Sequence, residues 1–422
     1  MGQKNNNGDT KMRIHNKYAV EAIVFFSYVL FAMAWVGATA NMGAIMAAMG
    51  IETLAAASML SGSVTVAKIV GTFIAAIVAV RLGIKAAFLV SALMIGVGLL
   101  TPFAPNYELL LISRFVVGLG GALMVVYFNP IVLRWFEPGE RPVINGINAV
   151  AFNAGTAVVL WLIEDLTALF GGWENTLSAF SIASIVLAGL WMLVDFDTPT
   201  AAEQPAAGTE AGAKRKAANE ETQGYGYGEG LRDSFNWRYA LSYSGVLCFY
   251  ICLFTFYPKA GITQGSLVMW AGIAGTLAGM YFSRRVPARI PVIRWSGLIM
   301  SVCVAGLSFS DSELYRSAFG LVLGFVIFFP VTALVTLPQE LPRMTPERIT
   351  VVFSLFYSIS YLISTFILWL FGWLVDSNGG DFSSAFSMIT LVSTTLFIGS
   401  FFLPETAPKK QAEASAPIAE SA

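Results

Sequence analysis

The stretch SGSVTVAKIVGTFIAAIVAVRLGIKAAF, residues 61–88, contains an apolar segment long enough to cross a membrane as a helix, with Lys68 near its middle. An ammonium group at the bilayer centre costs about 2.5 to 3.5 kcal/mol on insertion scales, so Lys68 must face a wet or polar interior. At helical spacing, one face of this segment carries Ser61, Thr65, Lys68 and Thr72. The stretch therefore predicts a membrane helix whose polar face points at something hydrophilic.

The composition of the whole chain indicates a polytopic membrane protein. Of 422 residues, 56% are hydrophobic and 12% are charged, and the mean hydropathy of +0.69 lies far outside the range of soluble domains. The formal net charge of −1 gives no indication of a nucleic-acid partner. The predicted partners are the lipid bilayer and a small molecule, and the chain is expected to be monomeric, with no cofactor and no metal.

Twelve apolar runs predict twelve transmembrane helices, six before and six after a polar segment. The runs cover residues 19–40, 54–80, 84–104, 108–133, 142–163, 176–194, 239–257, 265–283, 292–310, 316–337, 349–375 and 384–403. The polar segment 195–238 is rich in Ala, Glu, Gly, Lys and Gln and cannot form a core. The predicted plan is a tail (1–18), a six-helix half (19–194), a flexible linker (195–238), a second six-helix half (239–403) and a tail (404–422).

The basic residues predict the orientation, because lysine and arginine near helix ends stay on the cytoplasmic side. If both tails are cytoplasmic, all 25 lysines and arginines fall on that side except Lys68, Arg114, Lys259 and Arg316. We therefore expect cytoplasmic N- and C-termini, and location in a bacterial inner membrane.

An internal repeat relates the two halves. Matching residues recur in the same order, as Gly71-Thr72 with Arg81 against Gly275-Thr276 with Arg285, and as Arg114 with Gly118 against Arg316 with Gly320. Two similar halves predict a binding site at their interface, near the membrane midplane.

The segment AIVAVRLGIK, residues 76–85, resembles the signature loop of the major facilitator superfamily, a Gly-x-x-x-Asp-Arg-x-Gly-x-Lys/Arg pattern. Arg81, Gly83 and Lys85 are kept, whereas Ala76 and Val80 replace the glycine and the aspartate. The family's pattern in the fourth span is also present, as Arg114, Gly118 and Gly121.

The resemblance implies an all-α fold of twelve helices and transport by alternating access, with gating roles for Arg81, Gly83, Lys85, Gly118 and Arg285. In the family the aspartate of the loop helps to latch the cytoplasmic side, so Val80 implies a weaker latch or another acceptor for Arg81. Within the family, the chain is similar to the anion-handling branches, such as cyanate, nitrate or organic-anion permeases.

The balance of charge inside the predicted membrane region favours an anionic substrate. No aspartate or glutamate falls in the middle third of any predicted span, so Lys68 is short of an acidic partner. A bound anion would supply that partner. The alternative is a structural lysine bonded to carbonyls or amides of a neighbouring helix.

Other polar and aromatic residues recur at helical spacing and extend the predicted cavity. The candidate substrate-binding residues are Lys68, Thr65, Thr72, Arg114, Asn148, Tyr243, Tyr250, Tyr357 and Tyr361. Hydroxyls and amides can orient an oxyanion while rings hold an apolar part. The alternative for most of these residues is packing between helices, and for Arg114 it is helix positioning.

Other classes of function are less favoured. The chain has no Gly-x-x-x-x-Gly-Lys-Ser/Thr loop for ATP, and no cluster of ligands or nucleophile with a base, so neither an ATP-driven pump nor an enzyme is predicted. Two alternatives to anion transport stay open. They are efflux of amphipathic drug-like or siderophore-like compounds, for which the aromatic residues would serve, and a receptor or sensor that does not transport.

Overall fold

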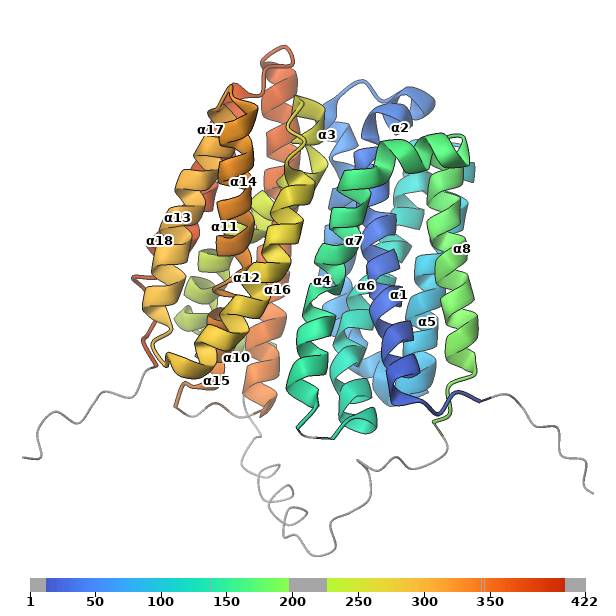
Figure 1. Ribbon diagram of the computed structural model, residues 1–422, viewed down its shortest axis with the longest axis vertical. Coiled ribbons are helices and arrows are strands. Elements are labelled where there is room, and N and C mark those ends of the chain that lie inside the picture. Colours follow the sequence, from blue (N-terminus) through green and yellow to red (C-terminus); the bar gives the residue numbers. More distant parts are fainter. Residues whose placement is uncertain (1–12, 138, 197–225, 343, 345, 407–422) are drawn as a thin grey trace, which may run out of the picture.

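The computed structural model describes residues 13–137, 139–196, 226–342, 344 and 346–406, which form a helical bundle in two halves (Figure 1). Most of the predicted linker (197–225) and parts of both predicted tails (1–12 and 407–422) lie outside the described residues. The predicted flexibility of the linker therefore stays a prediction.

The first half contains six membrane-spanning segments. They are α1 (Lys17–Ala40), α4 (Met59–Leu82), α5 (Ile84–Gly96) continued by η1 (Val97–Phe103), α6 (Tyr107–Trp135), α7 (Arg141–Phe170) and α8 (Trp173–Met192). Two short helices, α2 (Met42–Met49) and α3 (Leu54–Ala57), lie between α1 and α4. Asparagine side chains cap the N-termini of two spans. Asn16 accepts from the Tyr18 amide at 2.8 Å, and Asn106 accepts from the Leu109 amide at 2.9 Å.

The second half repeats this plan. Its six segments are α11 (Ser234–Thr255), α12 (Gly265–Arg285), α13 (Ile290–Phe309), α14 (Glu313–Phe328) with α15 (Val331–Gln339), α16 (Pro346–Ser377), and α17 (Ser383–Ser393) with α18 (Thr395–Gly399). A short 3-10 helix, η2 (Pro258–Ala260), follows α11. Pro330 lies at the break between α14 and α15, where its ring cannot donate the backbone hydrogen bond of a continuous helix.

The structure confirms the predicted all-helical architecture. Among the described residues, ten segments are individually long and apolar enough to cross a membrane. The other two are α11, which carries several tyrosines and serines, and the last span, which is interrupted at Thr394. The polar residues that weaken the hydropathy of α11 include two that line the central cavity, Tyr243 and Tyr250.

The end of the predicted linker is helical. A short helix, α10 (Tyr227–Arg232), precedes α11, and α11 begins at Ser234, five residues before the predicted start of the span at 239. Asp233 explains this early start, because its side chain accepts from the Phe235 amide at 3.0 Å and caps the helix.

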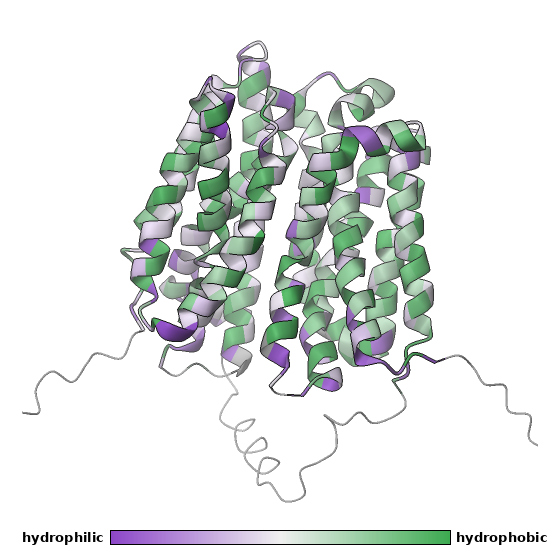
Figure 2. Cartoon of the chain, viewed as in Figure 1, coloured by the Kyte–Doolittle hydropathy of each residue, from purple (hydrophilic) through white to green (hydrophobic). Residues whose placement is uncertain are grey.

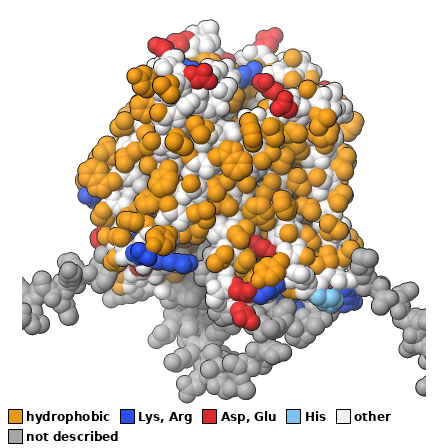
Figure 3. All heavy atoms as spheres, viewed as in Figure 1, with side chains coloured by type: hydrophobic (Ala, Val, Ile, Leu, Met, Phe, Trp, Pro, Cys, Tyr) orange, Lys and Arg blue, Asp and Glu red, His pale blue; other side chains and the backbone are white. Residues whose placement is uncertain are grey.

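All described chain ends meet one end of the bundle, which we call the linker side. There α1 begins, α8 ends and α10 begins, and the opposite end is called the far side (Figure 1). Most residues along the helices between these ends are hydrophobic, and the hydrophilic ones are most frequent near the two ends (Figure 2). On the face in Figure 3 the charged side chains gather near the two ends, which leaves an apolar belt between them.

Glycines let the second and fourth spans of each half approach closely. A Cβ atom on Gly118 of α6 would lie 2.8 Å from the Val64 Cα of α4. In the second half, Gly324 of α14 lies against the Val268 carbonyl of α12. Val64 and Val268 both lie seven residues before the Gly-Thr pair of the repeat. The glycines differ, because the repeat pairs Gly118 with Gly320, whereas the close contact in the second half is made by Gly324, one helical turn further along α14.

Replacing Gly118 by valine is expected to destabilise the α4–α6 contact by about 1 to 3 kcal/mol, the usual cost of overpacking. Thermal unfolding of the purified protein in detergent would measure it. The matched control is Gly189→Val in α8, where a Cβ atom would meet nothing within 4 Å. Equal melting temperatures for the two variants would contradict the predicted role of Gly118.

The two halves meet mainly through α4 with α16 and through α7 with α12. On the far side, the Thr65 and Thr365 hydroxyls are 2.6 Å apart, and the Ser61 and Thr255 hydroxyls are 3.0 Å apart. The hydrogen bonds described between the halves thus lie at the level of Lys68 or beyond it, and the far side is closed.

Candidate functional site

A cavity of about 360 Å³ lies between the two halves. It is lined by Tyr28, Trp35, Lys68, Val125, Phe128, Asn129, Asn145, Asn148, Ala149, Phe152, Asn153, Tyr243, Val246, Leu247, Tyr250, Ile251, Ile327, Phe328, Val331, Tyr357 and Tyr361. Asn129, Asn145 and Ala149 are exposed and belong to the linker-side parts of α6 and α7, whereas Trp35 and Lys68 are buried. The cavity is therefore open toward the linker side.

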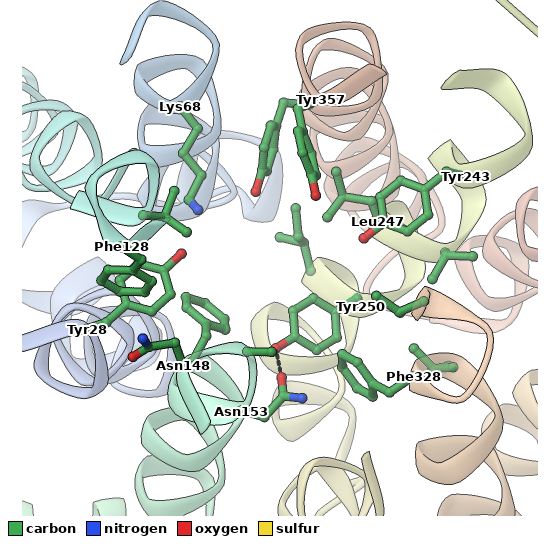
Figure 4. Close-up of a pocket in the computed structure, with 18 of the residues that line it drawn as sticks. Tyr28, Lys68, Phe128, Asn148, Asn153, Tyr243, Leu247, Tyr250, Phe328 and Tyr357 are labelled. Carbon is green, nitrogen blue, oxygen red and sulfur yellow. Dashed lines mark hydrogen bonds between the residues drawn. The ribbon is translucent and has the colours of Figure 1, made fainter. Parts of the chain in front are cut away.

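Lys68 extends into this cavity from α4 and is surrounded by aromatic rings (Figure 4). Its amino nitrogen lies 5.2 to 5.7 Å from the centres of four rings, which belong to Phe31, Trp35, Phe152 and Tyr361. Ring faces attract a cation, by about 0.5 to 2 kcal/mol each depending on solvation. The first three rings belong to the first half and Tyr361 to the second, so the cage joins the two halves.

Lys68 is the one charged residue of the cavity lining, in the part of the chain that the structure describes. It is 6% exposed, and Figure 4 shows its amino group turned into the space between Tyr28 and Tyr357. The rings provide no carboxylate and no carbonyl, so the three N–H donors of the ammonium remain available to an acceptor that enters the cavity.

Neutral polar groups surround this cation. Four asparagines and five tyrosines line the cavity and can donate or accept hydrogen bonds. One such bond joins the halves, because the Tyr250 hydroxyl of α11 donates to the Asn153 side chain of α7 at 2.8 Å (Figure 4). The Phe328 ring at the end of α14 lies 5.5 Å from the ring of Tyr250 and forms part of the wall.

The structure places most of the predicted binding residues together. Six of them line the cavity, namely Lys68, Asn148, Tyr243, Tyr250, Tyr357 and Tyr361. Thr65 and Thr72 do not line it. The Thr65 hydroxyl contacts Thr365, and the Thr72 hydroxyl donates to the Lys68 carbonyl at 2.7 Å, so both are used within the protein.

Arg114 also lies outside the cavity lining. Arg114 is 2% exposed, and its guanidinium donates to the Ala34 carbonyl at 2.6 Å and to the Trp35 carbonyl at 2.8 Å. Its Nε also reaches the Leu60 carbonyl at 3.4 Å. These contacts tie α6 to α1 and α4 and favour the helix-positioning alternative for Arg114.

Several lining residues were not among the predicted ones. The most important are Tyr28 and Trp35 of α1 and Phe152 of α7. Tyr28, Phe31 and Trp35 recur at spacings of three and four residues, which is a signal in the sequence. The same spacing is equally typical of aromatic residues packed between helices, so it does not separate the two roles.

One acidic residue is buried where an end of a helix was expected. Glu21 lies in the second turn of α1, is 5% exposed and faces the Asn148 side chain. Asn148 in turn lines the cavity. Glu21 does not lie in the middle third of its span. Its buried carboxylate nevertheless lies close to the cavity, on the linker side.

The predicted gating residues lie at the linker side or at a helix crossing. Arg81 and Lys85 are at the adjoining ends of α4 and α5, and Gly83 between them has φ of 77°, a conformation that favours glycine. Arg285 stacks on Tyr281 of its own helix, with 4.4 Å from its guanidinium carbon to the ring centre. Gly118 forms the close α4–α6 contact, and the gating roles themselves stay predictions.

Comparison with known proteins agrees with this architecture. The family model described as Major Facilitator Superfamily matches residues 24–365. A relative from Campylobacter jejuni, the uncharacterized protein Cj0987c, is 24% identical over 323 residues, which cover 73% of this chain and 95% of that protein.

Solved structures have the same fold. The inward-open form of the xylose transporter XylE from E. coli superposes with a TM-score of 0.72 at 14% identity, covering 94% of this chain and 98% of that one. A bacterial homologue of the human lysosomal transporter Spinster, in an inward-facing and occupied form, has a TM-score of 0.65 at 15% identity, covering 94% and 97%. The chain belongs to the major facilitator superfamily, as a secondary transporter and not an enzyme.

Proposed function

We propose that the protein transports a small anion with a single negative charge through the central cavity by alternating access. The observation that carries this proposal is Lys68, the one charged residue of the described lining, held there without a carboxylate partner. One ammonium can neutralise one negative charge. A second charge on the substrate would remain uncompensated in a partly desolvated site, which is costly.

The walls of the cavity support a substrate that combines an oxyanion with a compact apolar or hydroxylated body. Aromatic rings form much of the wall, while asparagine and tyrosine side chains offer hydrogen bonds. The volume of about 360 Å³ suits a small molecule and is at the low end for drug-sized ligands. This size favours a small anion over the larger compounds of the efflux alternative.

The basic residues indicate toward which side of the membrane the cavity opens. Lysines and arginines concentrate at the linker side, which we therefore assign to the cytoplasm. On this assignment the structure is an inward-facing state of a transporter in the bacterial inner membrane, with both termini cytoplasmic.

The test is transport into proteoliposomes that contain the purified protein. Each substrate is offered as a matched set with one carbon skeleton, as a monocarboxylate, its neutral amide and its dicarboxylate analogue, with nitrate, cyanate and xylose as further probes. We expect transport of at least one monovalent anion and loss of at least tenfold in rate for its amide and for the dianion. Preference for the amide, for the dianion or for xylose would overturn the proposal.

A receptor that does not transport would give a different result. It would bind the monovalent anion in a thermal-shift assay without moving it across the membrane. Liposomes without protein serve as the control, because they measure how fast the uncharged forms of the substrates cross the lipid bilayer unaided.

A further inference from the structure

A second cavity, which we call the outer groove, lies on the outside of the second half. It has a volume of about 440 Å³ between α11, α16 and the interrupted last span. Its lining consists of Arg238, Leu241, Ser242, Ser244, Gly245, Ile363, Ile367, Val392, Thr395, Ile398, Gly399 and Phe402. None of these residues lines the central cavity, so the outer groove lies on another face of α11.

The outer groove faces the hydrocarbon of the bilayer. Leu241, Ile398 and Phe402 line it and are 47%, 52% and 61% exposed. These residues belong to the apolar outside of the bundle, which in the membrane contacts lipid chains.

The hydroxyl groups in the outer groove are used by the helices themselves. Ser242 Oγ donates to the Arg238 carbonyl at 2.6 Å, and Ser244 Oγ donates to the Ala240 carbonyl at 2.7 Å. Thr395 Oγ1 accepts from the Gly245 amide at 3.0 Å. Since these groups are already satisfied, the surface that remains suits a hydrocarbon chain and offers little to a polar ligand.

A positive charge closes the linker-side end of the outer groove. Arg238 lies in the second turn of α11, is exposed, and makes no ion pair or side-chain hydrogen bond with other described residues. The acidic residue at the start of the same helix, Asp233, is paired with Arg348 at 3.0 Å. The Arg238 guanidinium is therefore free to bind an anion at the depth of the lipid headgroups.

We propose that the outer groove binds an anionic phospholipid, with an acyl chain along the groove and the phosphate on Arg238. A guanidinium presents several N–H donors in a plane and binds phosphate oxygens in pairs. A basic residue beside an intramembrane groove also favours anionic over zwitterionic headgroups. The combination of an apolar groove and one cation at its end fits a lipid better than a free ion or a protein helix.

The test is native mass spectrometry of the full chain in detergent, with phosphatidylglycerol and phosphatidylcholine of identical chains. We expect the wild-type protein to prefer phosphatidylglycerol by roughly fivefold, the effect of one basic residue at a lipid surface. Arg238→Gln should lose this preference while still binding phosphatidylcholine, which also shows that the variant is folded. Arg284→Gln, which removes an exposed arginine on the same side of the bundle, should keep it.

A second variant tests the groove itself. Ile398→Trp fills part of it and should weaken the binding of both lipids by a similar factor. Inorganic phosphate should not displace phosphatidylglycerol, because the acyl chain supplies most of the binding. Equal retention of the two lipids by the wild-type protein, an unchanged preference in Arg238→Gln, or displacement by phosphate would each overturn the proposal.

Discussion

Lys68→Ala is expected to abolish anion transport and to weaken anion binding by roughly a thousandfold. An ion pair at about 4 Å is worth about 4 kcal/mol at the effective dielectric constant that describes most protein sites. The variant should still insert and fold, because removing a charge from the bilayer centre relieves an insertion cost. Affinity for the anion and melting temperature, measured on the same purified protein, would establish the result.

Two further substitutions at this position separate charge from shape. Lys68→Arg should retain part of the binding, because the charge survives but a planar group does not fit the same ring cage. Lys68→Gln should bind weakly, since it keeps a donor and loses the charge.

The control is Lys259→Ala, which removes an exposed lysine on the far side, outside the cavity lining. A stable Lys68→Ala protein with wild-type affinity for the anion would show that Lys68 does not bind the substrate. A loss of thermal stability with normal affinity in the remaining protein would indicate the structural alternative. In that case the contacts of Lys68 with the four rings would stabilise the fold, and Lys68 would have no role in binding the substrate.

The architecture could be predicted from the sequence because bilayer thickness fixes the length of an apolar segment. The same constraint identifies Lys68 as a candidate functional residue, since a charge within such a segment must face a polar space. Its surroundings could not be predicted in the same way. The cage is formed by α1, α7 and α16, which come together only in the folded bundle.

For Arg114 and Glu21, the sequence does not show what surrounds a charged side chain within a span. A buried arginine can be satisfied by backbone carbonyls, as Arg114 is by those of α1, and the sequence does not show which carbonyls lie within reach. Glu21 lies two residues after the start of the predicted span at 19, near a helix end. It is buried because α1 begins at Lys17 and α7 lies against this turn.

A contact that the sequence did not indicate adds to the hydroxyl contacts that close the far side. Asp376, near the end of α16, accepts from the Leu54 amide at 2.8 Å and from the Ala55 amide at 2.8 Å. These amides belong to the first turn of α3, where N–H groups have no partner within the helix and a negative charge is favoured. Beside them, Gly372 lets α16 approach closely, because a Cβ atom there would lie 2.7 Å from the Leu54 carbonyl oxygen.

Asp376→Ala is therefore expected to shift the protein toward a state that is open on the far side. The two hydrogen bonds join the halves only while that side is closed, and a bond to a charged group contributes about 1.5 to 3 kcal/mol. One such contribution corresponds to a change of roughly ten- to a hundredfold in the ratio of the two states. The readout is maleimide labelling of a cysteine introduced at Ser61, in a protein whose three native cysteines have been replaced.

Labelling at Ser61 should rise in Asp376→Ala, and labelling of a cysteine at Asn145, on the linker side of the cavity, should fall. The matched control is Asp381→Ala, which removes an acid five residues away whose carboxylate bonds only within its own loop, to Ser383. A general loosening of the fold would raise labelling at both sites, whereas a two-state shift moves them in opposite directions. If the cysteine at position 61 reacts equally in the parent protein, Asp376→Ala and Asp381→Ala, then the carboxylate of Asp376 does not hold the far side closed, and the packing around Gly372 and the Thr65–Thr365 contact must be sufficient.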